Sequence, residues 1–245
     1  MDIQVIPYVN EARSTYFPFR TAVVIDVLRA TSFIASALAA NAEAVIPVET
    51  VLEAKKLRGP TDLLAGERFG RKIANFEFGI SPVEISNHNL AKKTIILTTS
   101  DGTRALKRAQ KADYILAASL QNVRAAAKVI NKLHRHVVIV CAGNHDQYAL
   151  EDGICAGMLI EELWQLTNGK IELDDFGKTV HSFYLQNKDN ITELLLSSKC
   201  GERLVRMGLK DDIYACSTIN QYDVVPMLIA GKLKATYPEQ LSILI

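Results

Sequence analysis

The feature that most constrains the fold is a repeated alternation of short β-branched runs with longer helical patterns. Residues 22–27, 94–100 and 136–143 are strand-like runs, and helical patterns follow them, as at 31–42 and 151–166. Apolar strands without in/out alternation are buried on both faces, as in parallel sheets that helices cover. The sequence therefore predicts an α/β fold, a three-layer α/β/α arrangement with a mainly parallel or mixed central sheet.

The chain is predicted to form a single domain, residues 1–245. Its 49% hydrophobic and 22% charged residues lie in the ordinary globular range, and no Pro/Gly/Ser-rich linker divides it. Residues 59–89 are rich in Gly, Pro and Asn, and are expected to form loops and short elements over the sheet. Further along, residues 187–212 are predicted as surface helices, 213–219 (IYACSTI) as a late strand and 224–233 as a closing element.

The charge balance and the hydropathy exclude several classes of protein. With 28 Lys and Arg against 27 Asp and Glu the net charge is +1, so no basic field is available for nucleic acid or an anionic membrane. The apolar runs are far shorter than the ~20 residues of a bilayer span, and the first residues lack the pattern of a signal peptide. We therefore expect a soluble, cytoplasmic protein whose four widely spread cysteines are reduced thiols.

Polar residues follow three of the predicted strands, where each strand runs into a helix. Asp26 ends the first strand and Arg29 lies one helical turn further on, residues 98–104 follow the second, and Glu151 and Asp152 begin the helix after the third. The carboxyl ends of parallel strands meet at one edge, where open α/β sheets bind ligands. We therefore expect these polar side chains to converge on one site.

The turn TTSDGTR, residues 98–104, has the composition of a phosphate cradle. A helix start offers unpaired N–H groups and the positive end of the helix dipole, and Arg104 can hold oxyanion oxygens in a bidentate contact. The residues predicted to bind substrate here are Thr99, Ser100, Asp101, Gly102 and Thr103. The alternative is that Ser100 or Asp101 only caps the helix that begins near Thr103.

The carboxylates that accompany this turn indicate a hard cation. Mg²⁺ usually binds through one or two carboxylates and keeps waters for the substrate, which predicts a metal site made by Asp26, Glu151 and Asp152. Glu151 and Asp152 point about 100° apart on a regular helix, so we expect only one of them to be a direct ligand. Two alternatives stay open: Asp26 caps the next helix, and the other two complement the helix dipole.

Several known motifs are absent or misplaced. The chain has neither a P-loop nor a dinucleotide-binding glycine pattern, and Leu28 stands where a haloacid-dehalogenase-like phosphatase has its second aspartate. Cys200 and Arg206 have the C-x₅-R spacing of cysteine phosphatases, but the preceding residues are predicted helical, which argues against that loop. His145 is interpreted either as an ordinary loop histidine or as a general acid.

Six segments, taken in order, resemble the 2-phosphosulfolactate phosphatase family of Mg²⁺-dependent acid phosphatases: DVLRATS, GERFGRKIANFEFGISP, TTSDGTRAL, CAGN, EDGICAGML and YACSTINQYDVVP. The match runs through nearly the whole chain. It implies a three-layer α/β fold and hydrolysis of (R)-2-phospho-3-sulfolactate to 3-sulfolactate and phosphate, a step towards coenzyme M in methanogens. The site residues that the resemblance implies are Asp26, Arg29, Glu67, Ser100, Asp101, Arg104, Glu151 and Asp152.

The resemblance draws attention to a charged stretch within residues 59–89. Glu67 and Arg68, followed by Arg71 and Lys72, place one carboxylate and three cations together. The implied substrate carries a phosphate, a sulfonate and a carboxylate, so its site needs more cations than one metal ion. We therefore predict that Glu67 and Arg68 bind substrate; the alternative is a solvated basic loop.

The predicted catalytic residues are Asp26, Arg29 and Arg104, with Mg²⁺ drawing negative charge from the phosphate as the ester bond breaks. The attacking group is either a metal-bound water or Asp26 itself. Two other functions stay open: a phosphatase for another small acidic phosphoester, and a non-catalytic anion-binding protein. No nucleic acid or membrane partner is expected, and a homodimer is common for chains of this size.

Overall fold

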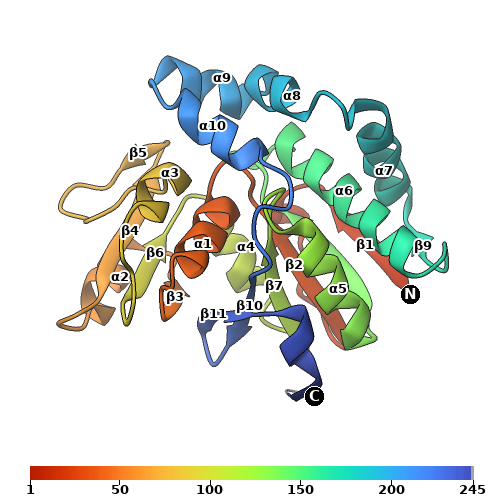
Figure 1. Cartoon of the computed structure of the whole chain (residues 1–245), viewed down its shortest axis with the longest axis horizontal. Coiled ribbons are helices and arrows are strands. Elements are labelled where there is room, and N and C mark those ends of the chain that lie inside the picture. Colours follow the sequence, from red (N-terminus) through yellow and green to blue (C-terminus); the bar gives the residue numbers. More distant parts are fainter. Residues whose placement is uncertain (244–245) are drawn as a thin grey trace.

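The computed structural model describes residues 1–243 and shows, within them, an eleven-strand mixed sheet with helices packed against it (Figure 1). The strand order is β5-β4-β6-β3-β11-β10-β7-β2-β8-β1-β9. The strands are β1 Asp2–Ile6, β2 Arg20–Ile25, β3 Ala44–Pro47, β4 Leu63–Arg68, β5 Arg71–Lys72, β6 Thr94–Thr98, β7 Tyr114–Ala118, β8 His136–Cys141, β9 Glu172–Leu173, β10 Val225–Ile229 and β11 Lys232–Thr236.

Residues 1–243 also contain ten α-helices, and none of these helices is long and apolar enough to span a membrane. The helices are α1 Ala30–Ala39, α2 Val51–Leu57, α3 Pro82–Ser86, α4 Gly102–Arg108, α5 Val123–Leu133, α6 Leu150–Leu166, α7 Asp175–Asn187, α8 Ile191–Ser197, α9 Lys199–Arg206 and α10 Lys210–Ser217. Three short 3₁₀ helices cover Val9–Glu11, Ser14–Tyr16 and Pro238–Ile243.

Alternate residues of the central strands pack into two separate hydrophobic cores. Val23 and Ile25 of β2 face a core built with α5 and α6, whereas Ala22 and Val24 face a core built with α1 and α4. Because β2 is buried on both faces, its apolar run is continuous rather than alternating. The predicted three-layer α/β/α fold is confirmed.

The sheet consists of two parallel blocks joined by an antiparallel hairpin. One block contains β4, β6 and β3, and the other contains β7, β2, β8, β1 and β9. The hairpin β10–β11 lies between them, and its turn residues Ala230 and Gly231 have φ angles of 49° and 79°. Two positive φ angles suit the tight turn that connects twisted antiparallel strands. The central sheet is therefore mixed.

The late strand predicted at 213–219 was wrong, because this segment belongs mainly to α10. Asp211 and Asp212 lie in the first turn of the helix, where negative charge is favourable. Ile213 and Cys216 are both buried at the i, i+3 spacing of one helix face. The aromatic and β-branched residues suggested a strand, but the helical spacing of the buried side chains decides the structure.

Part of the segment 59–89 belongs to the sheet instead of lying over it. β4 pairs in parallel with β6, with Gly66 opposite Thr98. Gly66 is required there because an added Cβ would lie 2.4 Å from the Thr98 carbonyl oxygen. Gly66 suggested a loop in the sequence, but it marks close packing inside a strand. Because β4 is a strand of the sheet, Glu67 lies at a fourth strand end beside the three that were predicted.

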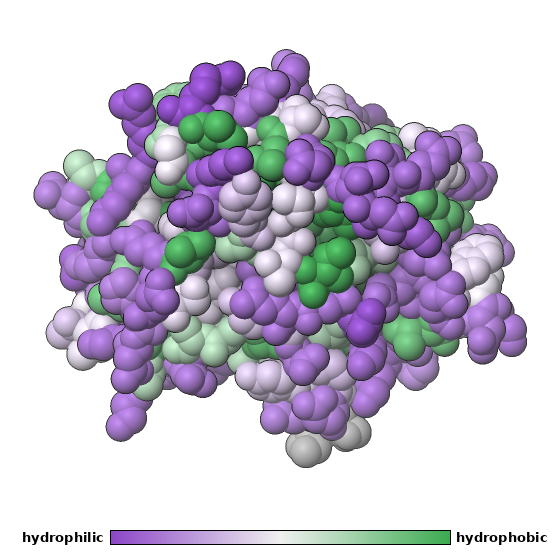
Figure 2. Space-filling view, turned by 45° about the horizontal axis from the view of Figure 1, so that its top comes forward, coloured by the Kyte–Doolittle hydropathy of each residue, from purple (hydrophilic) through white to green (hydrophobic). Residues whose placement is uncertain are grey.

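Three helices late in the chain, α8, α9 and α10, form what we call the helical cap. Figure 1 shows the cap above α1 and beside the β4–β5 region, with α10 next to α3. The face that carries the cap is mainly hydrophilic, with hydrophobic residues in small groups between polar ones (Figure 2). A ligand that approaches this face therefore meets mostly polar groups.

Candidate active site

A cleft lies where the ends of β2, β4, β6 and β8 meet the helical cap. Its cavity volume is about 40 Å³, so the space between these strand ends and the cap is narrow. The residues that line it are Asp26, Leu28, Arg29, Glu67, Phe69, Gly70, Ile80, Thr99, Ser100, Asp101, Gly143, Asn144, His145, Cys200, Arg203 and Leu204. Of the polar strand ends that the sequence predicted to converge, the cleft brings together Asp26, Arg29 and residues 99–101 with Glu67, whereas Glu151 and Asp152 do not line it.

Asp26 follows β2 and lines the cleft. Its Oδ1 accepts a hydrogen bond from the Ala30 N–H (3.2 Å), so Asp26 does cap α1 as the alternative reading proposed. Its Oδ2 has no hydrogen-bond donor within residues 1–243. Burial, and then the charges of Asp101 and Glu67, raise the pKa of Asp26 to about 7. A neighbouring cation would favour the charged form of this carboxyl group.

Glu67, at the end of β4, fixes two turns in the cleft wall. Its Oε1 accepts a hydrogen bond from the Ser100 N–H and its Oε2 accepts one from the Gly70 N–H, both at 2.7 Å. Each carboxylate oxygen has a second lone pair, and a ligand contact from Glu67 would have to use it. The structure therefore places Glu67 in the cleft, with both oxygens already bonded within the protein.

Several N–H groups of the turn between β6 and α4 are already hydrogen-bonded within the protein. The Ser100 N–H donates to Glu67, and the Thr103 N–H donates to Thr99 Oγ1 (3.1 Å). Asp101 occupies the N-cap position of α4 without a side-chain capping bond, so the capping alternative is wrong for this residue. The N–H groups of Thr99, Ser100 and Thr103 are thus already bonded, whereas those of Asp101, Gly102 and Arg104 have no acceptor in the described chain, so fewer N–H groups than expected can bind a phosphate.

Arg104 lies beside the cleft and is held by two carboxylates. Its Nη2 donates to Asp101 Oδ1 (2.9 Å) and to Asp146 Oδ1 (2.6 Å). The other Asp101 oxygen accepts a hydrogen bond from the His145 N–H (3.2 Å). Asp101 and Arg104 therefore connect the turn after β6 to the turn after β8. The positive charge of the Arg104 guanidinium is balanced by the carboxylates of Asp101 and Asp146.

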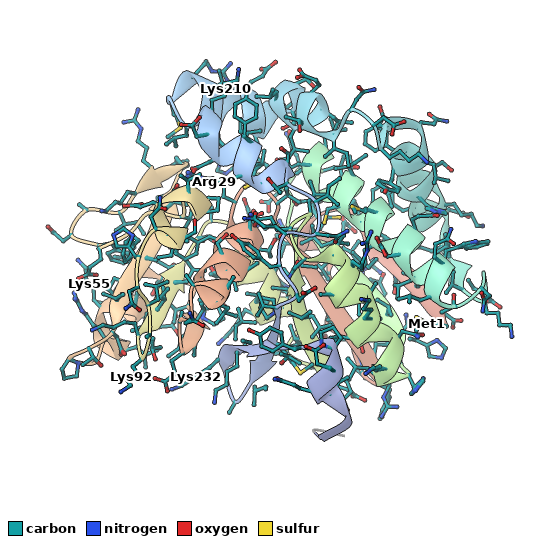
Figure 3. All side chains as sticks on the ribbon, viewed as in Figure 1. Met1, Arg29, Lys55, Lys92, Lys210 and Lys232 are labelled. Atoms are coloured by element: carbon teal, nitrogen blue, oxygen red, sulfur yellow. The ribbon has the colours of Figure 1, made fainter. Side chains whose placement is uncertain are left out.

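Arg29 lines the cleft but is also paired. Figure 3 shows it between α1 and the helical cap, where its Nη1 donates to Asp212 Oδ2 of α10 (2.5 Å). Its Nη2 donates to the Gly70 carbonyl (3.0 Å), and the Ser81 hydroxyl donates to the other Asp212 oxygen (2.5 Å). Both partners of the ion pair are 4% exposed. Arg29 therefore joins the end of β2, the β4–β5 turn and the cap.

Glu151 and Asp152, at the start of α6, are buried and do not line the cleft. Asp152 Oδ1 accepts a hydrogen bond from the Val27 N–H and Oδ2 accepts one from the Gly143 N–H, both at 2.9 Å. Burial, and then the charges of Asp26 and Glu151, raise the pKa of Asp152. Burial also raises the pKa of Glu151, which lies near Ser198 and Cys200. Of the three predicted metal ligands, Asp26 is the one in the cleft wall.

The cations predicted at residues 68–72 are not brought to the cleft. Arg68 donates to two backbone carbonyls and to Thr98 Oγ1 (2.9 Å), and Lys72 donates to another carbonyl (2.6 Å). The Arg71 side chain is exposed. Arg68 and Lys72 therefore stabilise the β4–β5 region, and the Arg71 side chain lies in solvent.

Arg203 of α9 is a charged cleft residue that the sequence did not predict. The C-x₅-R pattern had drawn attention to Cys200 and Arg206, and Cys200 does line the cleft. Arg206 instead forms an exposed ion pair with Glu202 (3.6 Å). The residues before Cys200 are helical, as predicted. With α9 accepted as a helix, the i, i+3 spacing would have placed Arg203 on the face of Cys200.

The oxygen donors of the cleft suit a hard cation, although they do not form a closed protein cage. Within residues 1–243, no group of three His, Cys, Asp or Glu side chains is arranged to hold a metal ion. Asp26, Asp101 and Glu67 nevertheless all line the cleft, and the charges of the latter two act on Asp26. Mg²⁺ needs only one or two carboxylates, because waters and substrate oxygens complete its shell. The residues present therefore fit Mg²⁺.

Known proteins resemble this chain over almost its full length. A family model described as 2-phosphosulpholactate phosphatase matches residues 8–231. A protein named probable 2-phosphosulfolactate phosphatase from Caldanaerobacter subterraneus subsp. tengcongensis is 38% identical over 221 residues, 89% of this chain and 91% of the relative. Relatives of the same name from Clostridium perfringens (38% over 240 residues, 96% of each chain) and Carboxydothermus hydrogenoformans (41% over 211 residues, 84% of this chain and 85% of the relative) are also similar.

Proposed function

The chain belongs to the 2-phosphosulpholactate phosphatase family, a family of phosphoric monoester hydrolases, and from that premise we propose that it hydrolyses (R)-2-phospho-3-sulfolactate to 3-sulfolactate and phosphate. The free oxygen of Asp26, in a cleft built from four strand ends and a helical cap, is the observation that carries this proposal. A place in coenzyme M biosynthesis, a cytoplasmic location and a homodimeric state stay predictions.

In the proposed complex the phosphate lies between Asp26 and the turn after β6. The free N–H groups of Asp101 and Gly102 would bind its oxygens, since N–H groups at a helix start favour anions. Arg104 keeps this turn in place through Asp101, and Arg29 keeps the cap against the strand ends. Both arginines thus preorganise the site, which is the main task of the protein in phosphoryl transfer.

We propose Mg²⁺ as the cofactor, held by Asp26 with waters and substrate oxygens completing its shell. Glu67 and Asp101, which line the cleft, would contribute their remaining lone pairs, whereas Asp152 is buried and does not line it. When bound, the ion supplies Lewis-acid polarisation of a phosphate oxygen. Nucleophilic attack by Asp26 itself is the alternative use of the same oxygen.

A phosphatase panel tests the function and the cofactor together. Phosphate release is measured from 2-phosphosulfolactate, 2-phospholactate and phosphoglycolate, each with Mg²⁺ and with a chelator. We expect the highest kcat/KM for phosphosulfolactate and a loss of at least about tenfold in the chelator. A clear preference for another ester would show that phosphosulfolactate is not the substrate. Full activity in the chelator would overturn the Mg²⁺ proposal, and no release from any ester would favour the anion-binding alternative.

Replacing Gly102 with alanine should disturb Asp26 directly. An added Cβ would lie 2.6 Å from both Asp26 Oδ2 and the Ala30 Cβ, so the carboxylate or the start of α4 must move. Because small displacements of reacting groups cost rate steeply, we expect kcat to fall at least about tenfold. Gly79→Ala is the matched control, since its Cβ would meet only Lys72 Cβ at 3.6 Å. Equal activity of the two variants would contradict this placement of Asp26.

A further inference from the structure

Arg203 differs from the other arginines at the cleft in its hydrogen-bond partners. It projects from α9 of the helical cap, and its Nη1 lies 3.4 Å from His145 Nε2 while its Nη2 lies 3.1 Å from Cys200 Sγ. Its Nε is buried and has no hydrogen-bond partner within the described residues. Burial also raises the pKa of the Cys200 thiol, so this neighbour is neutral and gives the guanidinium no compensating charge.

The other arginines at the cleft have carboxylate partners. Arg29 is paired with Asp212, and Arg104 is paired with Asp101 and Asp146. Arg203 forms no ion pair in the part of the chain that the structure describes. Glu151 is its acidic neighbour, near enough for the guanidinium to oppose the rise of the Glu151 pKa, but no ion pair joins the two in the described chain. A partly buried, unpaired guanidinium normally has an anionic ligand.

We propose that Arg203 binds the acid group of the substrate that does not react, a carboxylate or a sulfonate. This proposal rests on the proposed function, since it takes a 2-phospho acid as the ligand. Asp26 and the turn after β6 line the cleft from the strand ends, whereas Arg203 lines it from the cap. A short phospho acid that reaches both would have its phosphate at Asp26 and its acid group at Arg203.

His145 positions Arg203 for this contact. Its backbone N–H is fixed by Asp101 Oδ2, and its ring is stacked on Phe69 with 5.7 Å between ring centroids. With Nε2 as the acceptor, the imidazole holds one Nη of Arg203 and leaves Nε without a partner. The guanidinium can therefore offer unused N–H groups to a planar carboxylate or to sulfonate oxygens.

The test compares Arg203→Ala and Arg203→Lys with Arg206→Ala on three esters. Arg206 lies on the same helix and, among residues 1–243, forms an exposed ion pair with Glu202, so its removal changes the net charge equally without touching the cleft. The esters are 2-phosphosulfolactate, 2-phospholactate and isopropyl phosphate, which carry two, one and no acid groups besides the phosphate. Calorimetric titration with 3-sulfolactate and with lactate measures the same contact without turnover.

We expect Arg203→Ala to lower kcat/KM roughly 10- to 100-fold on the acidic esters, mainly through KM, and to leave isopropyl phosphate within about twofold. A loss on phosphosulfolactate alone assigns the sulfonate, and a loss on both acids assigns the carboxylate. Equal losses on all three esters, or no loss, would overturn the proposal. If the wild type hydrolyses none of them, the proposed function fails by itself. The 3-sulfolactate titration then decides: a Kd weakened at least about tenfold by Arg203→Ala supports the subsite, and an unchanged Kd refutes it.

Discussion

Replacing Asp26 with asparagine should lower kcat by about a hundredfold or more and, in metal-free buffer at pH 8, make the protein more stable. The loss of turnover follows from the loss of the free carboxylate oxygen of a residue that lines the cleft. The gain in stability follows from the raised pKa of about 7, because the folded protein must ionise a buried carboxyl group near Asp101 and Glu67. Asparagine keeps the acceptor for the Ala30 N–H without that charge.

The pH dependence of the stability difference has a definite direction. Below about pH 4 the Asp26 carboxyl is protonated in the folded and the unfolded chain, so the wild type and Asp26→Asn should have similar stabilities. As the pH rises to about 7 the unfolded chain releases its proton first, and the wild type loses stability relative to the variant. The difference should reach a few kcal/mol above pH 7, at about 1.4 kcal/mol for each pKa unit, and shift Tm by roughly 5 to 10 °C.

Thermal unfolding with a chelator, followed from pH 4 to pH 8 beside turnover assays, measures both effects. Asp175→Asn is the control, because Asp175 is fully exposed in the first turn of α7 and should change neither quantity. Rapid-quench labelling of the wild type separates the two uses of Asp26, since labelled protein in a burst would indicate an aspartyl nucleophile. Turnover at the wild-type level in Asp26→Asn would remove this residue from the site.

The sequence predicted the site best where strand, turn and helix are adjacent in the chain. Asp26 and the turn 98–104 could be placed because parallel strand ends converge, whatever the details of the sheet. Glu67 came only from the family resemblance, since Gly66 made its strand look like a loop. The structure resolves this because Gly66 packs against the Thr98 carbonyl, a contact between segments about thirty residues apart.

Contacts between distant segments set the remaining roles, and no local pattern contains them. Asp152 was predicted as a metal ligand, but it lies outside the cleft wall, where its two oxygens accept hydrogen bonds from the N–H groups of Val27 and Gly143. Arg29 was predicted to contact the phosphate, but Asp212 was placed at the end of surface helices just before a predicted strand at 213–219, so the partner of Arg29 could not be recognised. Which cations are neutralised within a protein depends on tertiary contacts of this kind.

Replacing Asp212 with alanine should cost about 3 to 5 kcal/mol of unfolding free energy, because it leaves Arg29 buried and without a counter-charge. The same change removes the acceptor for the Ser81 hydroxyl, so α3, α10 and the end of β2 lose their common contact. For a chain of this length Tm should fall by roughly 10 °C or more. Chemical denaturation at constant pH, with Tm as a second measure, checks this expectation.

The Arg29→Met/Asp212→Ala double variant separates the orphaned charge from lost packing. If the uncompensated guanidinium is the main cost, the double variant should be more stable than Asp212→Ala alone, since it removes both charges. Glu202→Ala serves as the surface control: its ion pair with Arg206 spans 3.6 Å at an exposed site, and its loss should cost under about 1 kcal/mol. If Asp212→Ala were no more destabilising than Glu202→Ala, the buried charge of Arg29 would not need Asp212 as its counter-charge. Arg29 would then again be a candidate for binding the phosphate.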